Sequence, residues 1–418
     1  MSEPVVIIGA GLAGLTCAYR LQQEKIDSII LEKSDRVGGR VATDEMDGFL
    51  LDRGFQVFLT AYPEAQSVLN YEDLDLKSFD PGALIRVNES FEKLSDPWKR
   101  PLELMTTAFA RIGTISDKLL ISKLRSLATK GSVEDQFERD DVCTLEELKR
   151  LGFSERMINQ FFQPFLGGVF LDSELETSAR MLYFVFRMFS LGKATLPAGG
   201  MQRIPEQISG HLPEDSIQLG STVERIEGRN VVLADGKVIS SRCVVVATDQ
   251  PVAETFLPEL QSKRKPRSVT CMYFSAERPP VQEPILVLNG EKSGLINNLC
   301  VPSQVSAEYA PAGQSLISVT VLDAPENNNE LLRDVQIQLA EWFGSVVVHW
   351  KHLRTYRIPY ALPNFTAPAF NPPQQPVKLR DDILVSGDYR VNGSINGALE
   401  SGRLTAECIL NEVHGCPR

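Results

Sequence analysis

The first forty residues contain two short apolar runs separated by a stretch with helical periodicity. Residues 5–8 are β-branched and apolar throughout, as in a strand that is buried on both faces of a sheet. Residues 12–23 carry apolar side chains at helical intervals, and residues 28–31 form the second apolar run. Strand, helix and strand in this order predict a βαβ unit, and with it an α/β fold.

Two long segments further along the chain have different patterns. Residues 81–195 have mostly helical periodicity, whereas residues 256–374 alternate β-rich runs with one helix. Helices are predicted at residues 102–110, 118–128 and 155–162, and another starts at Thr144 with Glu147 as capping partner. The β-rich segment predicts strands at residues 268–276, 315–322 and 346–360, a helix at residues 328–343 and a proline-rich extended connector at residues 360–376.

A glycine cluster follows the first predicted strand. Gly9, Gly11 and Gly14 have the spacing G-x-G-x-x-G, which permits a tight turn, close approach of backbone to a pyrophosphate and close packing of helix on strand. Glu32 ends the second strand, where a carboxylate can accept hydrogen bonds from ribose hydroxyls and disfavours a 2′-phosphate. The pattern predicts binding of NAD or FAD, with Leu12 and Ala13 at the helix start and Lys33 after the acid as further contacts.

A second glycine cluster distinguishes between these two cofactors. Arg36, Gly38, Gly39 and Arg40 form R-x-G-G-R directly after the ribose-binding acid. NAD has no use for further phosphate ligands there, whereas FAD extends beyond the first βαβ unit, and arginine presents a rigid donor fork to phosphate. A solvated basic turn is the alternative interpretation. We predict FAD, held at two points.

These motifs and four later stretches resemble the flavin-containing amine oxidoreductases in the broad sense, including monoamine and polyamine oxidases, protoporphyrinogen oxidases and phytoene-desaturase-like enzymes. "DGFLLDRGFQVF" (47–58), "LPAGGMQRIPEQI" (196–208) and the stretches 221–251 and 383–410 are similar to segments of these proteins. The resemblance implies that the backbone of Val223 contacts adenine and that Gly387 and Asp388 lie at the ribitol. It places Ser394, Ile395 and Asn396 near the pyrimidine side of the flavin.

The resemblance also implies a two-domain architecture shared with amine oxidases and GDP-dissociation inhibitors. A discontinuous Rossmann-like FAD-binding domain would comprise residues 1–80, 196–255 and 375–418. A mixed α+β substrate domain would comprise the helical insertion 81–195 and the β-rich insertion 256–374. We expect the active site between the two domains.

Composition excludes several other classes of function. The net charge of −11 argues against a nucleic-acid partner, and seven scattered cysteines without a C-x-x-C motif are typical of buried thiols in a reducing compartment. His349 and His352 have a possible metal-ligand spacing but no evident third ligand, so no metal is expected. No signal peptide or apolar run of spanning length is recognised. A cytoplasmic protein with possible peripheral membrane contact is therefore expected.

The same residues suggest a substrate class. Eight aromatic side chains lie within thirty residues, and most are expected in the domain core, with the remainder available to an apolar cavity; they are Phe161, Phe162, Phe165, Phe170, Tyr183, Phe184, Phe186 and Phe189. The lysine that amine oxidases of this family usually place near the flavin N5 would fall within residues 268–274, which contain none, and an aromatic cage position falls at Ser394.

We therefore expect an FAD-dependent oxidase or desaturase that takes hydride from an apolar, conjugated substrate. Its electron acceptor would be oxygen or a quinone, and its FAD would be bound without a covalent link, since no cysteine or histidine lies at an obvious flavin-linking position. No catalytic residue is assigned. An amine oxidase is the alternative, and a non-catalytic lipid-binding protein of the GDP-dissociation-inhibitor kind is a third possibility.

Overall fold

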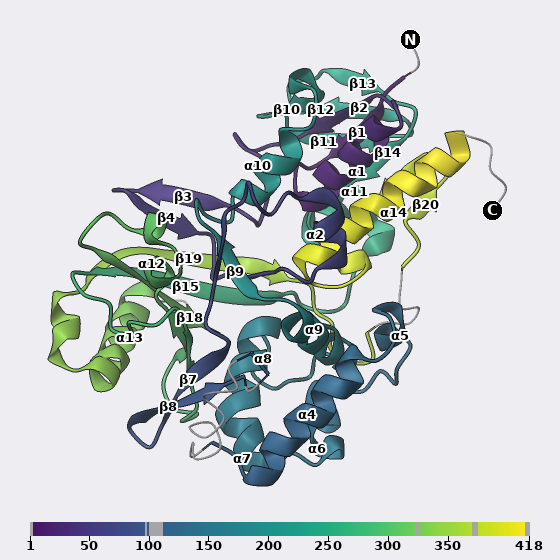
Figure 1. Cartoon of the computed structure of the whole chain (residues 1–418). Coiled ribbons are helices and arrows are strands. Elements are labelled where there is room, and N and C mark those ends of the chain that lie inside the picture. Colours follow the sequence, from purple (N-terminus) through teal and green to yellow (C-terminus); the bar gives the residue numbers. More distant parts are fainter. Residues whose placement is uncertain (1–2, 97, 100–111, 323–326, 370–374, 414–418) are drawn as a thin grey trace.

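A computed structural model describes residues 3–96, 98–99, 112–322, 327–369 and 375–413. A six-stranded sheet occupies one end of the molecule, at the top of Figure 1, in the order β10, β2, β1, β14, β21, β20. All neighbours are parallel except β20 and β21. The strands are β1 (Val5–Ile8), β2 (Ser28–Leu31), β10 (Ile217–Gln218), β14 (Val244–Val246), β20 (Lys378–Arg380) and β21 (Ile383–Val385).

Alternation along β1 explains how this sheet is buried on both faces. Val5 and Ile7 belong to the core that contains Leu15 of α1 (Leu12–Gln23) and Leu399 of α14 (Ile395–Val413). Val6 and Ile8 point the other way, into a second core with α11 (Gln250–Phe256) and the antiparallel sheet β11 (Val223–Glu227), β12 (Asn230–Leu233) and β13 (Val238–Ser240). The first two strands and the first helix have the residue ranges predicted from periodicity.

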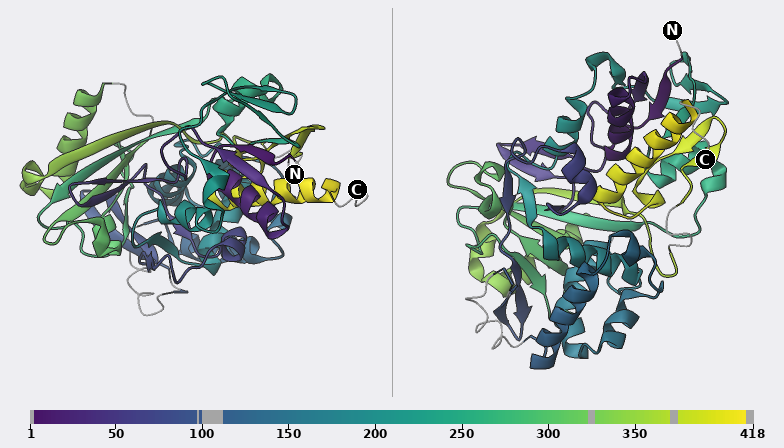
Figure 2. Two further views of the ribbon diagram at one scale, coloured as in Figure 1. Left: turned by 90° about the horizontal axis from the view of Figure 1, so that it is seen from above. Right: turned by 45° about the vertical axis from the view of Figure 1, so that its right-hand side comes forward.

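Helices α1 and α14 lie side by side although they are nearly 400 residues apart in the chain (Figure 2). Gly402 makes this approach possible, because a Cβ there would lie 2.4 Å from the carbonyl oxygen of Ala13. Helix α10 (Arg203–Ser209) also contacts α1, and α2 (Pro63–Val68) contacts α14. The C-terminal helix therefore completes the cover over the first strands of the chain.

The second large sheet has seven strands, in the order β19, β15, β18, β17, β16, β7, β8. Helix α13 (Asn328–Phe343) covers one face through Leu331, Val335 and Leu339. The strands are β7 (Gly82–Val87), β8 (Ser90–Ser95), β15 (Arg267–Ala276), β16 (Leu286–Asn289), β17 (Ile296–Cys300), β18 (Ser315–Val321) and β19 (Lys351–Leu362), and α12 (Pro302–Val305) precedes β18. The predicted strand at residues 346–360 is wrong at its start, where residues Ser345–His349 form a 3₁₀ turn before β19.

The helical region lies at the bottom of Figure 1. Its elements are α4 (Ile115–Thr129), α5 (Glu134–Phe137), α6 (Thr144–Leu151), α7 (Glu155–Met157), a π-helical turn (Ile158–Phe162), α8 (Gln163–Phe170) and α9 (Ala179–Leu191). The capping box predicted at Thr144 is wrong: Cys143 is the N-cap residue, and the Thr144 hydroxyl donates instead to the carbonyl of Thr177 at 2.7 Å. The predicted helix at residues 102–110 lies outside the described residues.

Short sheets connect these parts. The hairpin of β3 (Thr43–Met46) and β4 (Phe49–Asp52) follows the second glycine cluster. The sheet β5–β9–β6 combines Phe58–Leu59, Ala194–Pro197 and Leu76–Ser78. All strands of the six-stranded sheet come from the segments predicted for the FAD-binding domain. All strands of the seven-stranded sheet come from the two insertions predicted for the substrate domain. The division into two domains itself stays a prediction. No described helix is both long enough and apolar enough to cross a bilayer.

Candidate active site

A cavity of about 1460 Å³ lies where the parallel sheet, the seven-stranded sheet and the helical region meet. Its wall runs from Gly9 and Gly11 at one end to α4, α8 and α9 at the other. Pockets for one small ligand typically measure about 300–1,000 Å³, so this cavity has room for a dinucleotide and a substrate together. We call the two parts the cofactor end and the aromatic end.

The cofactor end is built mainly from backbone. Gly9, Gly11, Leu12 and Ala13 all line the cavity at the start of α1. Gly11 is the N-cap residue and has no capping side chain, so the first N–H groups of the helix have no intrahelical acceptor. The positive end of a helix with open N–H groups fits a pyrophosphate, and this geometry is compatible with the predicted dinucleotide.

Glu32 lies at the end of β2 with only 8 % of its surface exposed, and it also lines the cavity, as does Lys33. Its carboxylate accepts hydrogen bonds from the backbone N–H of Ala10 at 2.8 Å and of Ser34 at 2.9 Å. These bonds fix the carboxylate beside the glycine turn. The Ser34 hydroxyl also donates to it at 2.7 Å, and since a carboxylate accepts about four hydrogen bonds, acceptor capacity remains for about one ribose hydroxyl.

The second glycine cluster closes the same end. Gly38, Gly39 and Arg40 line the cavity, and the positive φ of Gly38 (+116°) would strain any other residue. The guanidinium of Arg40 donates to both carboxylate oxygens of Asp388, at 2.9 and 2.6 Å. This bidentate pair joins the R-x-G-G-R segment to the C-terminal motif across 348 residues of chain.

The C-terminal motif and the adenine segment reach the same wall. Gly387, Asp388, Ser394, Ile395 and Val223 all line the cavity. The Ser394 hydroxyl accepts from the N–H of Gly397 at 3.0 Å and so caps the start of α14. Ser394 therefore has a structural role in addition to the position that the resemblance implied.

Three predicted site residues do not lie on the described wall: Gly14, Arg36 and Asn396. Gly14 packs α1 against the strand, since a Cβ there would lie 2.1 Å from the carbonyl oxygen of Gly9. Asn396 accepts from the N–H of Glu64 at 3.0 Å and fixes α2 beside α14. Arg36 donates to the Thr43 carbonyl at 2.9 Å and pairs with Asp44.

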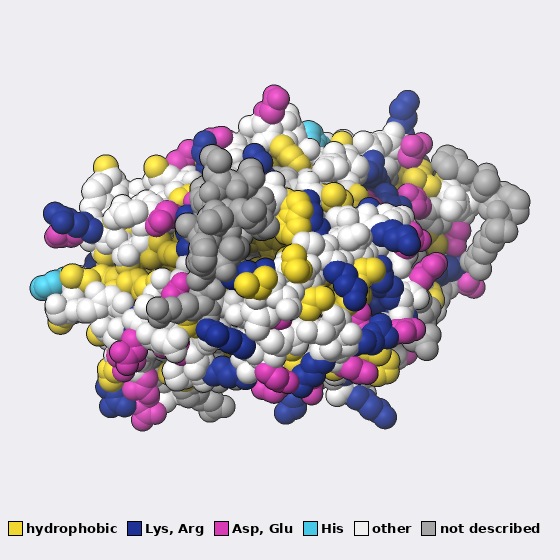
Figure 3. Space-filling view, turned by 60° about the horizontal axis from the view of Figure 1, so that its bottom comes forward, with side chains coloured by type: hydrophobic (Ala, Val, Ile, Leu, Met, Phe, Trp, Pro, Cys, Tyr) yellow, Lys and Arg dark blue, Asp and Glu magenta, His cyan; other side chains and the backbone are white. Residues whose placement is uncertain are grey.

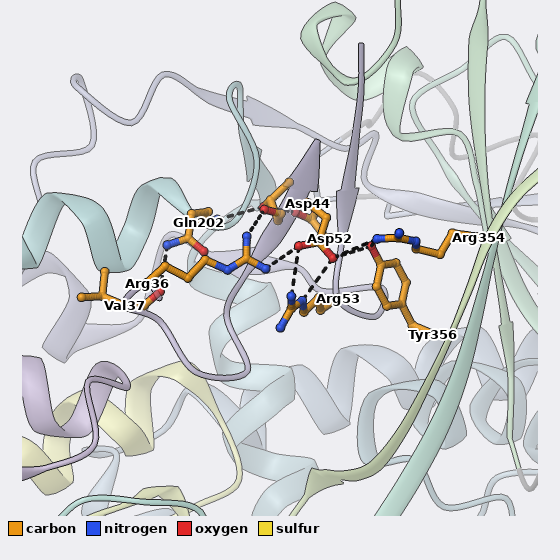
Figure 4. Close-up of polar contacts among 9 residues, drawn as sticks. Arg36, Val37, Asp44, Asp52, Arg53, Gln202, Arg354 and Tyr356 are labelled. Atoms are coloured by element: carbon orange, nitrogen blue, oxygen red, sulfur yellow. Dashed lines mark hydrogen bonds and ion pairs between the residues drawn. The ribbon is translucent and has the colours of Figure 1, made fainter. Parts of the chain in front are cut away.

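Asp44 is the centre of an ionic cluster between the hairpin β3–β4 and strand β19 (Figure 4). It accepts from Arg36 and Arg53 and from the Tyr356 hydroxyl at 2.7 Å, and Arg354 lies 3.5 Å away. Burial would raise the pKa of Asp44, but these hydrogen bonds outweigh it and lower the pKa well below its usual range. The cluster connects the segment after the second glycine cluster to the β-rich insertion.

Asp52, at the end of β4, makes a second, fully buried junction. Its carboxylate accepts from Thr43 Oγ1 at 2.5 Å, from the Met201 N–H at 3.0 Å and from the Tyr309 hydroxyl at 2.8 Å. Burial raises the pKa of Asp52 to about 6 despite these bonds. Its next neighbours, Arg53 to Phe55, line the cavity, so Asp52 positions that part of the wall.

The aromatic end is built from side chains. Five of the eight aromatic residues singled out in the sequence lie on the wall, more than expected; they are Phe161, Phe165, Phe170, Phe186 and Phe189. Phe162, Tyr183 and Phe184 are core residues that do not line the cavity. The π-helical turn adds a residue to the helix just before α8, and Phe161 within it stacks on Phe165 with ring centroids 5.4 Å apart.

Other wall residues were not singled out by sequence reasoning. They come from many elements and include Phe55, Phe79, Trp98, Ile121, Met181, Val185, Val269, Asn298, Thr320, Ile358 and Leu362. The described lysines on the wall are Lys33, Lys99, Lys118 and Lys193, and none comes from β15. No local pattern could have found these residues, because only the tertiary fold brings their segments together. Among the described residues, no group of three His, Cys, Asp or Glu side chains could hold a metal ion.

A family model described as flavin containing amine oxidoreductase matches residues 12–410. The chain belongs to this family. It is therefore a flavin-dependent oxidoreductase, and the predictions of the family, of the enzyme class and of FAD as cofactor are confirmed at this level. The predicted α/β amine-oxidase-like fold is confirmed by the solved structures below.

Two characterised relatives indicate the range of the family. The chain is similar to 15-cis-phytoene desaturase from an Oncidium hybrid cultivar, with 23% identity over 98% of this chain and 78% of that protein. It is similar to coproporphyrinogen III oxidase from Bacillus subtilis, with 25% identity over 53% of this chain and 50% of that protein. The latter match therefore spans about half of each protein.

Two solved structures share the fold. An oxidoreductase from Methanosarcina mazei has a TM-score of 0.74 at 18% identity, covering 97% of this chain and 100% of that chain. Putrescine oxidase bound to putrescine has a TM-score of 0.72 at 16% identity, covering 98% and 99%. At these identities the likeness concerns the fold alone.

Proposed function

We propose that the protein is an FAD-dependent oxidase or desaturase that removes hydride from an apolar, conjugated substrate bound at the aromatic end. The observation that carries this proposal is the continuity of the cavity, from the open N–H groups of α1 to the wall containing Phe161 and Phe165. When bound, FAD supplies a hydride acceptor, and the chain supplies position and electrostatics.

The chain's own residues suit this role. Gly11, Glu32 and the Arg40–Asp388 pair would hold the cofactor without a covalent link. The phenylalanines would orient a planar lipophile and exclude water, since burial of apolar surface contributes about 25 cal/mol per Å². A cationic amine would be desolvated there without the cage aromatic, because Ser394 occupies that position and caps α14.

The test is anaerobic mixing of the FAD-loaded protein with substrates of each class while the flavin absorbance is followed. We expect bleaching by a carotenoid-like or porphyrinogen-like compound or by a hydroquinone, and little by mono- or polyamines. The reduced protein would then be mixed with oxygen or with a quinone to identify the acceptor, for which we propose one of these two. Acid precipitation that releases all of the FAD would support non-covalent binding.

An amine oxidase is the second candidate. The observation that favours it is the shared fold with putrescine oxidase over 98% of the chain. Rapid bleaching by an amine, with none by the lipophiles, would select this candidate over the first.

A further inference from the structure

Large apolar side chains are exposed at the aromatic end of the cavity and on the neighbouring helix α4. Among the described residues, Trp98 is 44% exposed and Leu191 is 58% exposed, and both line the cavity. Ile115 and Leu119 are 76% and 70% exposed on α4, the helix whose Ile121 also lines the cavity. Solvated apolar side chains grouped in this way are typical of a surface that contacts another apolar phase.

Basic side chains accompany them. Arg125 lies over the ring of Trp98, 5.1 Å from its centroid, and donates to the Ser190 carbonyl at 3.1 Å. Lys99 donates to the Phe189 carbonyl at 2.6 Å, and Lys193 is exposed beside it at the end of α9. Burial lowers the pKa of Lys99, the carboxylate of Asp96 opposes this, and the nearby cations Arg125 and Lys193 lower the pKa as well, so three cations and one anion lie together here.

This group of cations is notable because the whole chain carries a net charge of −11. Lys118 and Lys123 of α4 add to it on the same helix as Ile115 and Leu119. Figure 3 shows the molecule with the helical region turned forward, with hydrophobic side chains at the surface beside a hollow and with Lys and Arg side chains interspersed with Asp and Glu around them. Interfacial segments of peripheral proteins combine apolar residues that enter the headgroup region with lysine and arginine that meet anionic lipid.

We propose that the face formed by Trp98, Ile115, Leu119 and Leu191, with its surrounding cations, docks on an anionic bilayer surface. The opening of the cavity would then face the membrane, and a lipophilic substrate could enter without crossing water. The docking is argued from the surface residues alone. The entry of a lipophilic substrate from the membrane rests on the proposed function.

The test is co-sedimentation of the full-length, FAD-loaded protein with vesicles of phosphatidylcholine alone and of phosphatidylcholine with phosphatidylglycerol. We expect binding to the anionic vesicles, weakened by added salt, and little binding to the neutral ones. The double variant Ile115→Asp and Leu119→Asp should bind the anionic vesicles at least tenfold more weakly. The matched control is Ile337→Asp with Val348→Asp, which changes two side chains that are 53% and 79% exposed on α13 and the 3₁₀ turn before β19.

Several outcomes would overturn the proposal. They are absence of wild-type binding to anionic vesicles, equal loss of binding in the control variant, and binding that the Ile115 and Leu119 changes leave intact. A concentration-dependent dimer in light scattering that only the Ile115→Asp, Leu119→Asp variant abolishes, with no vesicle binding, would assign the face to a second copy of the chain. If the variant still shows flavin bleaching by a detergent-solubilised substrate, membrane docking and the chemical step are separate. If no lipophile reduces the flavin, the proposed function fails, but vesicle binding still tests the docking.

Discussion

The two ends of the cavity are built on different principles. At the cofactor end, backbone atoms of Gly9, Gly11 and Gly38 form the wall, and their positions follow from short contiguous stretches with strict spacing. At the aromatic end, side chains from α4, α8, α9 and several strands form the wall. We therefore expect a single added carbon atom at the cofactor end to impair either packing or FAD binding. At the aromatic end, we expect substitutions to change substrate selectivity with little effect on the fold.

The sharpest contrast lies within the first glycine cluster. Gly14→Ala places a Cβ 2.1 Å from the carbonyl oxygen of Gly9, so the free energy of unfolding should fall by about 3 kcal/mol or more. A Cβ at Gly11 would have no neighbour within 4 Å, and the φ of Gly11 is −74°, which alanine adopts readily. The free energy of unfolding of Gly11→Ala should therefore differ from that of the wild type by less than about 0.5 kcal/mol. Chemical denaturation of the FAD-free proteins measures both.

The same pair separates packing from binding. Gly11→Ala should still weaken FAD binding, because its methyl group would stand where backbone is expected to approach the pyrophosphate. A folded Gly11→Ala protein with wild-type FAD affinity would show that the pyrophosphate lies elsewhere.

The next largest effect is expected at Glu32. Glu32→Ala removes a buried carboxylate that faces the cavity, and FAD affinity should fall about 10- to 150-fold, or about 1.5–3 kcal/mol. Ser34→Ala is the control, since it removes only the hydroxyl that donates to Glu32 at 2.7 Å. Titration of each FAD-free variant with FAD measures the loss; equal losses in the two variants would indicate that Glu32 acts through the turn and not through ribose.

This contrast also explains how far the sequence predicted the structure. β1, α1 and β2 were predicted to the residue, because a buried parallel strand and an amphipathic helix each leave a local pattern. Helix α13 was predicted equally well for the same reason. The cap at Thr144 failed because a tertiary partner, the Thr177 carbonyl, takes its hydroxyl, and the Ser345–His349 turn resembled a strand only through its valines.

The site divides in the same way. Most of the glycines and acids predicted at the cofactor lie on the cavity wall, whereas Gly14 and Asn396 serve packing; contact of the wall residues with FAD stays a prediction. Arg36 was expected at the cofactor because of its charge, but the partner that it finds, Asp44, could not be identified without the hairpin β3–β4. The aromatic wall depends on a π-helical turn and on residues from distant strands, for which periodicity gives no signal.

A smaller effect is expected at the ionic cluster of Asp44, between the hairpin β3–β4 and strand β19 (Figure 4). Asp44→Asn removes the charge that Arg36, Arg53 and Arg354 share, and the free energy of unfolding at neutral pH should fall by about 1–2 kcal/mol, since two of these arginines are nearly half exposed. Because the folded state lowers the pKa of Asp44, the wild-type advantage is present above the unfolded pKa of 3.8 and is lost as the pH falls below it. Denaturation at neutral pH and near pH 3 should therefore show a difference between wild type and variant that shrinks with acid. A constant difference would mean that hydrogen-bond geometry, and not charge, stabilises the cluster.

The smallest effect on stability is expected at the aromatic end. Phe165 lines the cavity and is only partly buried, so Phe165→Leu should lower the free energy of unfolding by about 1 kcal/mol or less. Phe165 presents its ring to the cavity, and an aromatic contact with a conjugated substrate there would be worth about 0.5–1.5 kcal/mol, so the KM for a conjugated lipophile should rise about two- to tenfold. Phe162→Leu, in the π-helical turn directly before α8, is the matched control: its ring is fully buried and off the wall, so the variant should lose more stability and keep the KM unchanged. Denaturation and steady-state kinetics of the two variants measure the four values, and a Phe162→Leu protein with the larger change in KM would place the substrate away from the α8 wall.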